Sequence, residues 1–338
     1  MSTLVAREAT EPAEARGLTR DGIRLLAHSG GRIEHTVFRD LGRFLGPGDL
    51  LVVNTSATLP AAVDGYRADG SPVTVHFATR FDDETWALEL RHTDGTPGPI
   101  RDVRRFEAVR FPGGGCAMAL LLEPYPDEDA PRRLWKARIT VPHARVETFL
   151  ADRGRPITYA YMRERWPLTA YQTVFARDGG SAEMPSAGRP FTHELVVDLI
   201  TRGVVVAPVV LHTGVSSQEI GEPPLREWYH VPESTAALVG QARRVIAVGT
   251  TVTRALESAA DADGRVTAAK GWTDLLLGPD RPARVVDGIV SGLHAPEATH
   301  LLLLEAVVGA DVVRRAYDEA LAEGYLWHEF GDSSLLLP

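Results

Sequence analysis

Residues 204–211 read Val-Val-Val-Ala-Pro-Val-Val-Leu, a nearly unbroken apolar run that is rich in β-branched side chains. Strands buried on both faces read this way, and they are typical of parallel sheets that helices cover. The segment before the run has helix signals. Thr192 suits the N-cap position, and Gly203 follows Arg202 where the helix should end. A helix that leads directly into a buried strand predicts an α/β fold.

The same alternation extends in both directions from this run. Upstream, Asp49–Val53 predicts another buried strand. Downstream, the pattern predicts helices over Glu233–Arg243, Thr251–Ala260 and Thr299–Val308 and strands over Val245–Val248 and Arg284–Val290. Consecutive strand–helix–strand units connect by right-handed crossovers, which make their strands parallel. We therefore expect an α/β core with a parallel sheet, either open or closed.

A segment of different character interrupts this pattern. From Pro60 to about Val141 the chain alternates short strands with turn residues, as in Val73–Phe77 and Trp86–Leu90. Closely spaced short strands predict a small all-β unit. We expect an α/β core over residues 1–59 and 152–338, and an inserted β domain over residues 60–151.

Composition and charge argue against several classes of protein. The 338 residues carry a formal net charge of −9 and a pI near 5.7, which is not the strongly basic balance typical of nucleic-acid binders. Cys116 is the only cysteine, so no intramolecular disulfide and no cysteine-based metal site can form, and no metal motif predicts a metal. The N-terminal residues lack the apolar segment of a signal peptide, and no apolar stretch is long enough to span a bilayer. We expect a cytoplasmic protein without a membrane partner.

The candidate site lies where the predicted strands end. In parallel α/β sheets, ligands bind beyond the carboxyl ends of the strands. Small polar loops follow four of them: Asn54-Thr55-Ser56, His212-Thr213-Gly214, Gly249-Thr250-Thr251 and Ser291-Gly292-Leu293-His294. The sequence therefore predicts that these loops converge around one ligand.

Several side chains in this region have two interpretations. Gly249-Thr250-Thr251 opens a helix, and together with Arg254 it is either an anion-binding helix start or an ordinary N-cap beside a solvated arginine. His212 and His294 are candidates for acid–base chemistry, or they are hydrogen-bonded structural residues. Tyr171 and Trp272 either stack on a base or pack in a core.

Six motifs of this chain resemble one enzyme family along most of its length. They are Gly48-Asp49-Leu50-Leu51-Val52-Val53-Asn54, Ala170-Tyr171-Gln172-Thr173-Val174-Phe175-Ala176, Pro185-Ser186-Ala187-Gly188-Arg189-Pro190-Phe191-Thr192, Gly249-Thr250-Thr251-Val252-Thr253-Arg254-Ala255-Leu256-Glu257-Ser258, Gly271-Trp272-Thr273-Asp274-Leu275 and Phe330-Gly331-Asp332. Their residues and order resemble the S-adenosylmethionine:tRNA ribosyltransferase-isomerases of the queuosine pathway. The match runs from about residue 46 to the end and is weakest in the predicted β insertion.

The resemblance implies a parallel α/β barrel-like core that a smaller all-β domain interrupts. It implies S-adenosyl-L-methionine as a substrate, with tRNA as the acceptor. In this family the ribosyl carbons of S-adenosylmethionine move to the aminomethyl group of a 7-deazaguanine in tRNA. The carbons rearrange to an epoxycyclopentanediol, and adenine and methionine leave.

This chemistry suggests roles for residues of the matching motifs. The carbon beside the sulfonium must lose a proton and the departing adenine must gain one, so His212, Glu227 and His294 are the catalytic candidates. The methionine carboxylate needs an anion site, which we assign to Gly249–Thr251 and Arg254. Asp274 is a candidate to orient ribose hydroxyls or the ammonium group. The other predicted substrate-binding residues are Asn54, Tyr171, Gln172, Ser186, Ala187, Gly188, Thr213, Gly214 and Trp272.

The chain also departs from the family pattern. Pro190 stands where the family has a histidine, and Thr55-Ser56-Ala57 stands where it has Asp-Thr-Arg. A site that loses polar partners discriminates less well for the ligand it was built for. Two alternatives therefore accompany the main prediction. One is a relative that uses S-adenosylmethionine with a small-molecule acceptor or as a lyase; the other is a non-catalytic protein that binds S-adenosylmethionine or a nucleotide.

Overall fold

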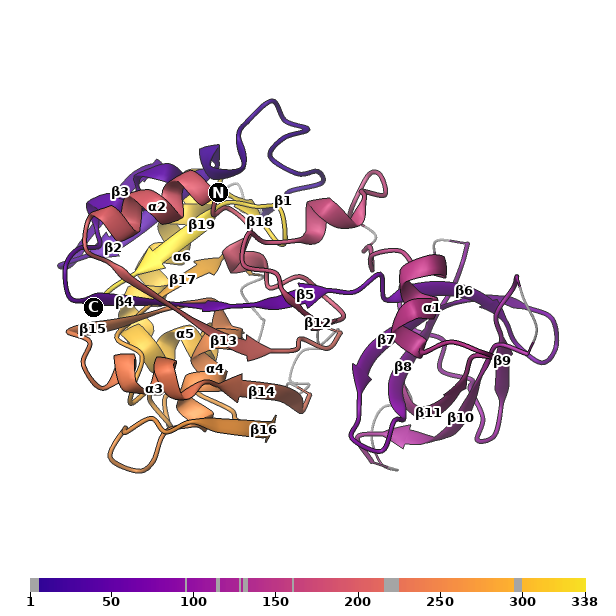
Figure 1. The fold of residues 1–338 in the computed structure, drawn as a ribbon. Helices are drawn as coiled ribbons and strands as arrows, with labels where there is room; N and C mark the ends of the chain where they lie inside the picture. The colour runs from indigo at the N-terminus through magenta and orange to yellow at the C-terminus, as the bar shows by residue number, and fades with distance from the viewer. Residues whose placement is uncertain are drawn as a thin grey trace.

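The computed structural model describes residues 6–94, 96–113, 116–127, 129, 133–159, 161–215, 225–294 and 300–338. A large α/β body is built on a nine-stranded sheet, and a smaller closed β-barrel stands beside it (Figure 1). The extended segment from β4 (Asp49–Asn54) through β5 (Ser56–Thr58) leads from the sheet to the barrel.

The large sheet has the strand order β16-β14-β13-β4-β15-β17-β19-β2-β3. In that order its strands span Ala269–Thr273, Glu227–Val231, Val205–Leu211, Asp49–Asn54, Arg244–Val248, Gly288–Gly292, Ser333–Leu336, Arg24–Ser29 and Arg32–Val37. The four neighbours β13, β4, β15 and β17 run parallel. The edge strands pair antiparallel, as in β13 with β14 and β2 with β3.

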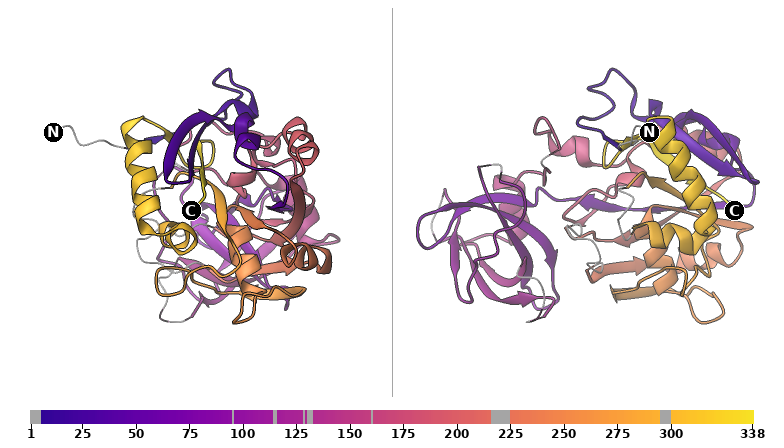
Figure 2. Two further views of the ribbon diagram at one scale, coloured as in Figure 1. Left: turned by 90° about the vertical axis from the view of Figure 1, so that its left-hand side faces the viewer. Right: turned by 180° about the vertical axis from the view of Figure 1, so that it is seen from behind.

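Helices cover both faces of the sheet. They are α2 (His193–Thr201), α3 (Glu233–Val239), α4 (Thr250–Ser258), α5 (His300–Val308) and α6 (Ala310–Ala322). Successive side chains of β4 pack into different cores: Leu50 and Val52 join the core under α4, α5 and α6, while Leu51 and Val53 join the core under α2. This two-sided burial explains why the central strands read as continuous apolar runs. Figure 2 shows the C-terminal helices, in yellow, lying across one side of the sheet.

The sequence predicted the parallel centre correctly and the rest of the sheet incompletely. The predicted strand at 204–211 is β13, and Thr192 caps α2 by accepting a hydrogen bond from the backbone N–H of Leu195. The barrel-like closure expected for this core is not confirmed, because its nine strands form an open mixed sheet. The added strands β14, β16, β19, β2 and β3 flank the parallel centre on its two sides, and several of them are joined without a crossover helix, so their pairing is partly antiparallel. Thr299, the expected start of α5, lies outside the described residues.

The closed barrel is the predicted all-β segment. Its strand order is β10-β11-β8-β7-β6-β9. These strands span Met118–Tyr125, Leu134–Thr140, Trp86–Arg91, Pro72–Arg80, Ala62–Tyr66 and Ala108–Arg110. The barrel has a separate apolar core, to which the following helix α1 (Val146–Arg153) contributes Phe149 and Leu150. The chain enters and leaves side by side, since Ala62 and Arg155 form an antiparallel bridge.

Two short parallel strand pairs lie outside the large sheet and the barrel. Beside the link to the barrel, β5 pairs in parallel with β12 (Asp178–Ser181), and β1 (Arg7–Glu8) pairs with β18 (Leu326–Trp327). Among the described residues, no helix is long and apolar enough to cross a bilayer.

Candidate active site

Asn54 ties together three of the four predicted strand-end loops. It ends β4, and its side-chain amide donates to the carbonyl oxygen of Leu211 (2.8 Å) and to Thr251 Oγ1 (3.3 Å). Its carboxamide oxygen accepts from the backbone N–H of Leu211 and of Ser56, each at 3.0 Å. Because Asn54 is buried and uses both ends of its amide, it fixes the ends of β4 and β13 to the start of α4.

His212 follows β13 and lies in a polar chain of contacts. Its Nδ1 is 2.8 Å from Ser56 Oγ, which is 2.6 Å from Ser181 Oγ. The His212 ring stacks on Trp228, with the ring centres 5.3 Å apart. Burial lowers the pKa of His212, so the imidazole is neutral near pH 7. The serine and the indole hold the ring in one orientation at the carboxyl end of the sheet.

The start of α4 is an open helix terminus beside a second short segment. Gly249 has φ 93°, a conformation that favours glycine, and no side chain caps the helix. A Cβ atom at Gly249 would lie 3.2 Å from the Cβ of Ala187. The 3₁₀ turn η4 (Ser186–Gly188) therefore packs against this helix start, which brings together two groups of predicted residues.

Arg254 and Glu227, two of the predicted site residues, contact each other. Arg254 is 6% exposed and its guanidinium contacts the Glu227 carboxylate. Its other contacts are with the carbonyl oxygens of Leu275 (3.2 Å), Thr273 (3.2 Å) and Leu225 (3.3 Å). The donors of Arg254 are thus directed at the protein itself, and its predicted contact with the substrate stays a prediction.

Glu227 is the partner of this arginine. Besides Arg254, its carboxylate accepts from the backbone N–H of Gly214 at 3.1 Å, and Gly214 is the end of the loop that carries His212 and Thr213. Burial raises the pKa of Glu227, and the charge of Arg254 opposes that shift. The Arg254–Glu227 pair therefore connects the His212 loop to α4. The Glu227 carboxylate is occupied by these two contacts within the protein.

Three other predicted residues make contacts within the protein, and a fourth is exposed. Gln172 pairs its side-chain amide with the backbone N–H and carbonyl of Thr58, at 3.0 and 2.8 Å, and so extends β5. Tyr171 is 2% exposed, and its ring packs on Phe330. Trp272 donates its Nε1–H to Asp82 of the barrel at 2.9 Å. Asp274 is exposed at the surface.

His294 ends the loop after β17 and lies in a group of buried rings. Its ring stacks on His300 with centres 4.4 Å apart, and its backbone N–H lies 3.4 Å from the hydroxyl of Tyr317. Burial first, and then the nearby His300 and His328, lower the pKa of His294 well below its usual value. Among the contacts of the described residues, none joins His294 directly to His212.

Two carboxyls that the sequence analysis did not single out, Glu183 and Glu329, lie near these loops. Thr213 Oγ1 donates to the carbonyl oxygen of Glu183 at 2.5 Å, which joins Glu183 to the His212 loop, and the Tyr159 hydroxyl contacts its carboxylate. Tyr161 lies next to the carboxyl of Glu329. Glu329 Oε2 is buried and has no hydrogen-bond partner within the described part of the chain.

The two carboxyls influence each other. Burial, followed by the charge of Glu183, raises the pKa of Glu329 to about 8. Burial and the nearby Glu329 also raise the pKa of the Tyr161 hydroxyl. The only sequence signal for these carboxyls was their position, since Glu183 shortly precedes the motif starting at Pro185 and Glu329 directly precedes Phe330.

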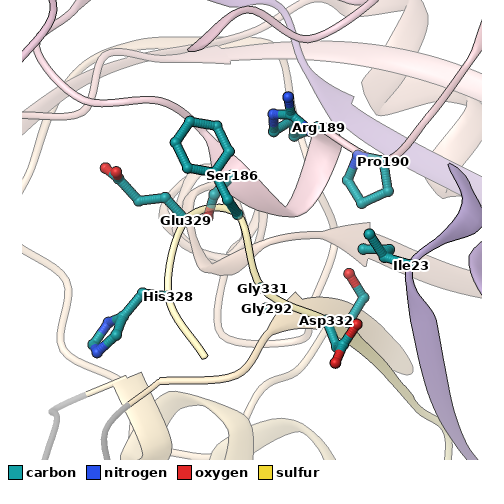
Figure 3. Close-up of a pocket in the computed structure, with 11 residues that line it drawn as sticks. Ile23, Ser186, Arg189, Pro190, Gly292, His328, Glu329, Gly331 and Asp332 are labelled. Carbon is teal, nitrogen blue, oxygen red and sulfur yellow. The ribbon is translucent and has the colours of Figure 1, made fainter. Parts of the chain in front are cut away.

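Aromatic rings and a small cavity adjoin the pair. The rings of Tyr159 and Tyr161 are 6.1 Å apart and nearly parallel, and Tyr161 also stacks on His328 at 4.9 Å. A cavity of about 10 Å³ next to Glu329 has room for about one water and is lined by Ile23, Ser186, Arg189, Pro190, Gly292, His328, Glu329, Phe330, Gly331, Asp332 and Ser333. In Figure 3, Glu329 and His328 extend to one side of their loop, and Ile23 and Asp332 lie on the other. In the part of the chain that the structure describes, no three His, Cys, Asp or Glu side chains are grouped to hold a metal.

Comparison with known proteins assigns the chain to a family. The sequence profile described as "Queuosine biosynthesis protein" matches residues 4–336. The S-adenosylmethionine:tRNA ribosyltransferase-isomerase of Moorella thermoacetica is 35% identical, with 97% of this chain and 96% of that protein covered. The enzyme of the same name from Symbiobacterium thermophilum is 34% identical, covering 99% and 96%.

A solved structure agrees with this assignment. The crystal structure of S-adenosylmethionine tRNA ribosyltransferase from Thermotoga maritima matches with a TM-score of 0.50 and 28% identity, over 99% of this chain and 96% of that one. The chain is therefore an enzyme of the queuosine biosynthesis protein family, the family of the S-adenosylmethionine:tRNA ribosyltransferase-isomerases.

Proposed function

We propose that this enzyme transfers the ribosyl carbons of S-adenosylmethionine to the aminomethyl group of 7-aminomethyl-7-deazaguanine in tRNA, with release of adenine and methionine. The observation that carries the proposal is the convergence of the loops after β4, β13 and β15, which Asn54 joins by hydrogen bonds. These loops lie at the carboxyl edge of the parallel centre, where α/β sheets bind their ligands. The names of the relatives supply the substrates.

The start of α4 is the proposed site of the methionine carboxylate. A helix N-terminus presents backbone N–H groups and a partial positive charge to an anion. Gly249 allows close approach, and the hydroxyls of Thr250 and Thr251 add polar groups. Arg254, on α4, contacts the Glu227 carboxylate and the carbonyl oxygen of Thr273 at the end of β16. These contacts hold α4 in place, so Arg254 is a positioning residue.

His212 is the proposed base for the carbon beside the sulfonium. The positive sulfur makes that carbon acidic, and a neutral imidazole is suited to accept its proton. When Nδ1–H donates to Ser56 Oγ, Nε2 is the unprotonated nitrogen that faces the reaction. His294 is the second acid–base candidate: its lowered pKa keeps the imidazole neutral near pH 7, so it can accept a proton during the reaction.

Product analysis tests this proposal. The enzyme is incubated with S-adenosylmethionine alone, with S-adenosylmethionine and tRNA that carries 7-aminomethyl-7-deazaguanine, and with the same tRNA lacking that base. We expect adenine, methionine and an epoxycyclopentanediol adduct on the modified tRNA, detected by mass spectrometry. Adenine release with unchanged tRNA favours the small-molecule or lyase alternative. Absence of adenine in every arm leaves only a binding protein and contradicts the proposal.

A further inference from the structure

Gly180, a residue of β12, lies against the ring of His212. A Cβ atom on Gly180 would lie 2.4 Å from Nδ1, 2.5 Å from Cε1 and 2.6 Å from Cγ of His212. Atoms that are not bonded do not approach so closely, so a side chain on this residue would collide with the imidazole. The φ angle of Gly180 is not in the left-handed region, so its backbone does not by itself require glycine. The position of the imidazole explains why glycine is needed here.

An irregularity in strand pairing accompanies this close approach. In the parallel pair of β12 and β5, Gly179 pairs with Ala57 and Ser181 pairs with Thr58. The register between these two described strands therefore leaves Gly180 unpaired, as the extra residue of a β-bulge. Bulges redirect the chain locally and are common beside active sites. Here the bulged residue is the one that contacts the predicted catalytic histidine.

Two other residues hold the same ring. Trp228 of β14 stacks on it, with ring centres 5.3 Å apart and 18° between the ring planes. Ser56 of β5 fixes one edge, since its Oγ lies 2.8 Å from Nδ1 of His212. We call the space that Gly180, Trp228 and Ser56 form around the imidazole the histidine slot.

The backbone around the histidine slot is fixed by hydrogen bonds. The backbone N–H of Ala182, just after β12, donates to the carbonyl oxygen of Thr213 at 2.7 Å, and the N–H of Thr213 donates to Ser181 Oγ at 3.0 Å. The N–H of His212 donates to the carbonyl oxygen of Trp228 at 3.0 Å. Because β12 and the His212 loop hold each other, a new side chain on β12 would be accommodated by rotation of the imidazole.

We propose that Gly180 is a positioning residue for the reaction, because its lack of a side chain lets Trp228 and Ser56 orient the imidazole of His212 toward the substrate. The inference rests on the proposed function, in which His212 takes the proton from the carbon beside the sulfonium. Proton transfer requires the base within hydrogen-bond reach and in the correct direction. A displaced ring therefore slows the reaction, while the residues that bind S-adenosylmethionine are unchanged.

Two neighbouring glycines provide the test and its matched control. Gly180→Ala puts a Cβ atom into the histidine slot, whereas the nearest atom to a Cβ on Gly179 is Cδ2 of Leu59 at 3.5 Å, an ordinary contact. The substrates are S-adenosylmethionine and tRNA that carries 7-aminomethyl-7-deazaguanine. We expect Gly180→Ala to lower kcat for adenine release about 100-fold and to leave the KM for S-adenosylmethionine within about 2-fold. Gly179→Ala should behave as the wild type does.

The same substitution in a second background separates positioning from a structural effect. His212→Ala leaves no ring to displace, so adding Gly180→Ala to it should change kcat by less than about 2-fold. A structural role of Gly180 would instead lower kcat in both backgrounds.

A further variant tests the histidine slot without adding atoms. Trp228→Leu removes the stacked indole, and we expect kcat about 10-fold lower, with no further loss when it is combined with His212→Ala. Thermal melts establish that each variant is folded. If Gly180→Ala does not fold, the result for Trp228→Leu decides.

The outcomes separate this inference from the proposed function. If the wild type releases adenine and Gly180→Ala has the same kcat as Gly179→Ala, the histidine slot is wrong and the proposed function stands. An equal loss of kcat in the His212→Ala background overturns it in the same way, as does an unchanged kcat in Trp228→Leu when Gly180→Ala is unfolded. If the wild type releases no adenine, the proposed function fails and this inference fails with it.

Discussion

The carboxyls of Glu227 and Glu329 are both removed from solvent, and their surroundings differ in one respect. Glu227 contacts Arg254 and accepts a backbone N–H, so its charge is balanced by the protein. Glu329 has the acidic Glu183 as its charged neighbour, and one of its oxygens is buried without a partner. The first arrangement holds the fold together. The second keeps the Glu329 carboxyl mostly protonated at neutral pH.

The difference shows that residues of a recognisable motif can bond to the protein itself. Arg254 belongs to the helix motif that resembles an anion site, yet its guanidinium is directed at Glu227 and at backbone carbonyls. Asp332 of the C-terminal motif is similar, since its carboxylate accepts from the backbone N–H groups of Arg24 and Leu326. Glu329, beside that motif, is the carboxyl left without compensation.

Removing Arg254, the cation that balances Glu227, should produce the largest change in the free energy of unfolding. Arg254→Ala leaves Glu227 buried and unpaired, and we expect a loss of about 3–5 kcal/mol in the free energy of unfolding. Urea denaturation measures it. Arg202→Ala is the matched control, because Arg202 forms an exposed ion pair with Asp198 on α2 and should cost about 0–1 kcal/mol. A stable Arg254→Ala protein that has lost S-adenosylmethionine affinity would restore the anion-site role.

The loop that follows β13 and carries His212 should hold a residue that the reaction needs. His212→Ala is expected to lower the rate of adenine release about 100-fold or more, the usual contribution of a general base, with little change in stability. His230→Ala serves as control, because His230 also lies near Trp228 but belongs to β14 rather than to a strand-end loop. Equal rates for the two variants would remove His212 from the chemistry.

The Glu329 carboxyl should make the free energy of unfolding depend on pH. Because the folded protein raises the pKa of Glu329 to about 8, its protonated form is favoured in the fold, and stability falls as pH rises from the unfolded value near 4.5 toward 8. Glu329→Gln removes this loss. We expect the variant to exceed the wild type by roughly 1–3 kcal/mol at pH 8, with a smaller difference at pH 5. Denaturation curves at both pH values test this, and a difference that does not vary with pH contradicts it.

The smallest change in stability is expected for the exposed hydrogen bond between Trp272 and Asp82. Trp272→Phe removes the hydrogen bond from the indole to Asp82, which joins the core to the barrel, and should cost about 0.5–1 kcal/mol. A double-mutant cycle with Asp82→Ala isolates the contact. A coupling free energy as large as the cost of Arg254→Ala would mean that this exposed contact is as important as the buried pair.

Local patterns predicted a large part of the fold. The apolar run at 204–211, the cap at Thr192 and the all-β segment after Pro60 correspond to β13, α2 and the barrel. Patterns within a few residues produce these elements, so they are readable in order along the chain. The edge strands were harder to predict, because β14 and β16 are short and find their partners only in the assembled sheet.

Part of the candidate site could also be predicted from the sequence, and part could not. That polar loops end the parallel strands follows from the sequence, and Asn54 does join them. The roles of Gln172, Trp272 and Arg254 did not follow, because each side chain bonds to a segment distant in the chain.

By itself, the sequence determined the family, the parallel centre of the sheet, and the loops that close its carboxyl edge. Only the tertiary structure decided which charges are balanced. Glu183 and Glu329 are 146 positions apart in a chain of 338 residues, and neither belongs to a periodic pattern. Whether a buried carboxyl is compensated depends on what the fold places within a few ångströms of it, and that spacing is set by packing rather than by order along the chain.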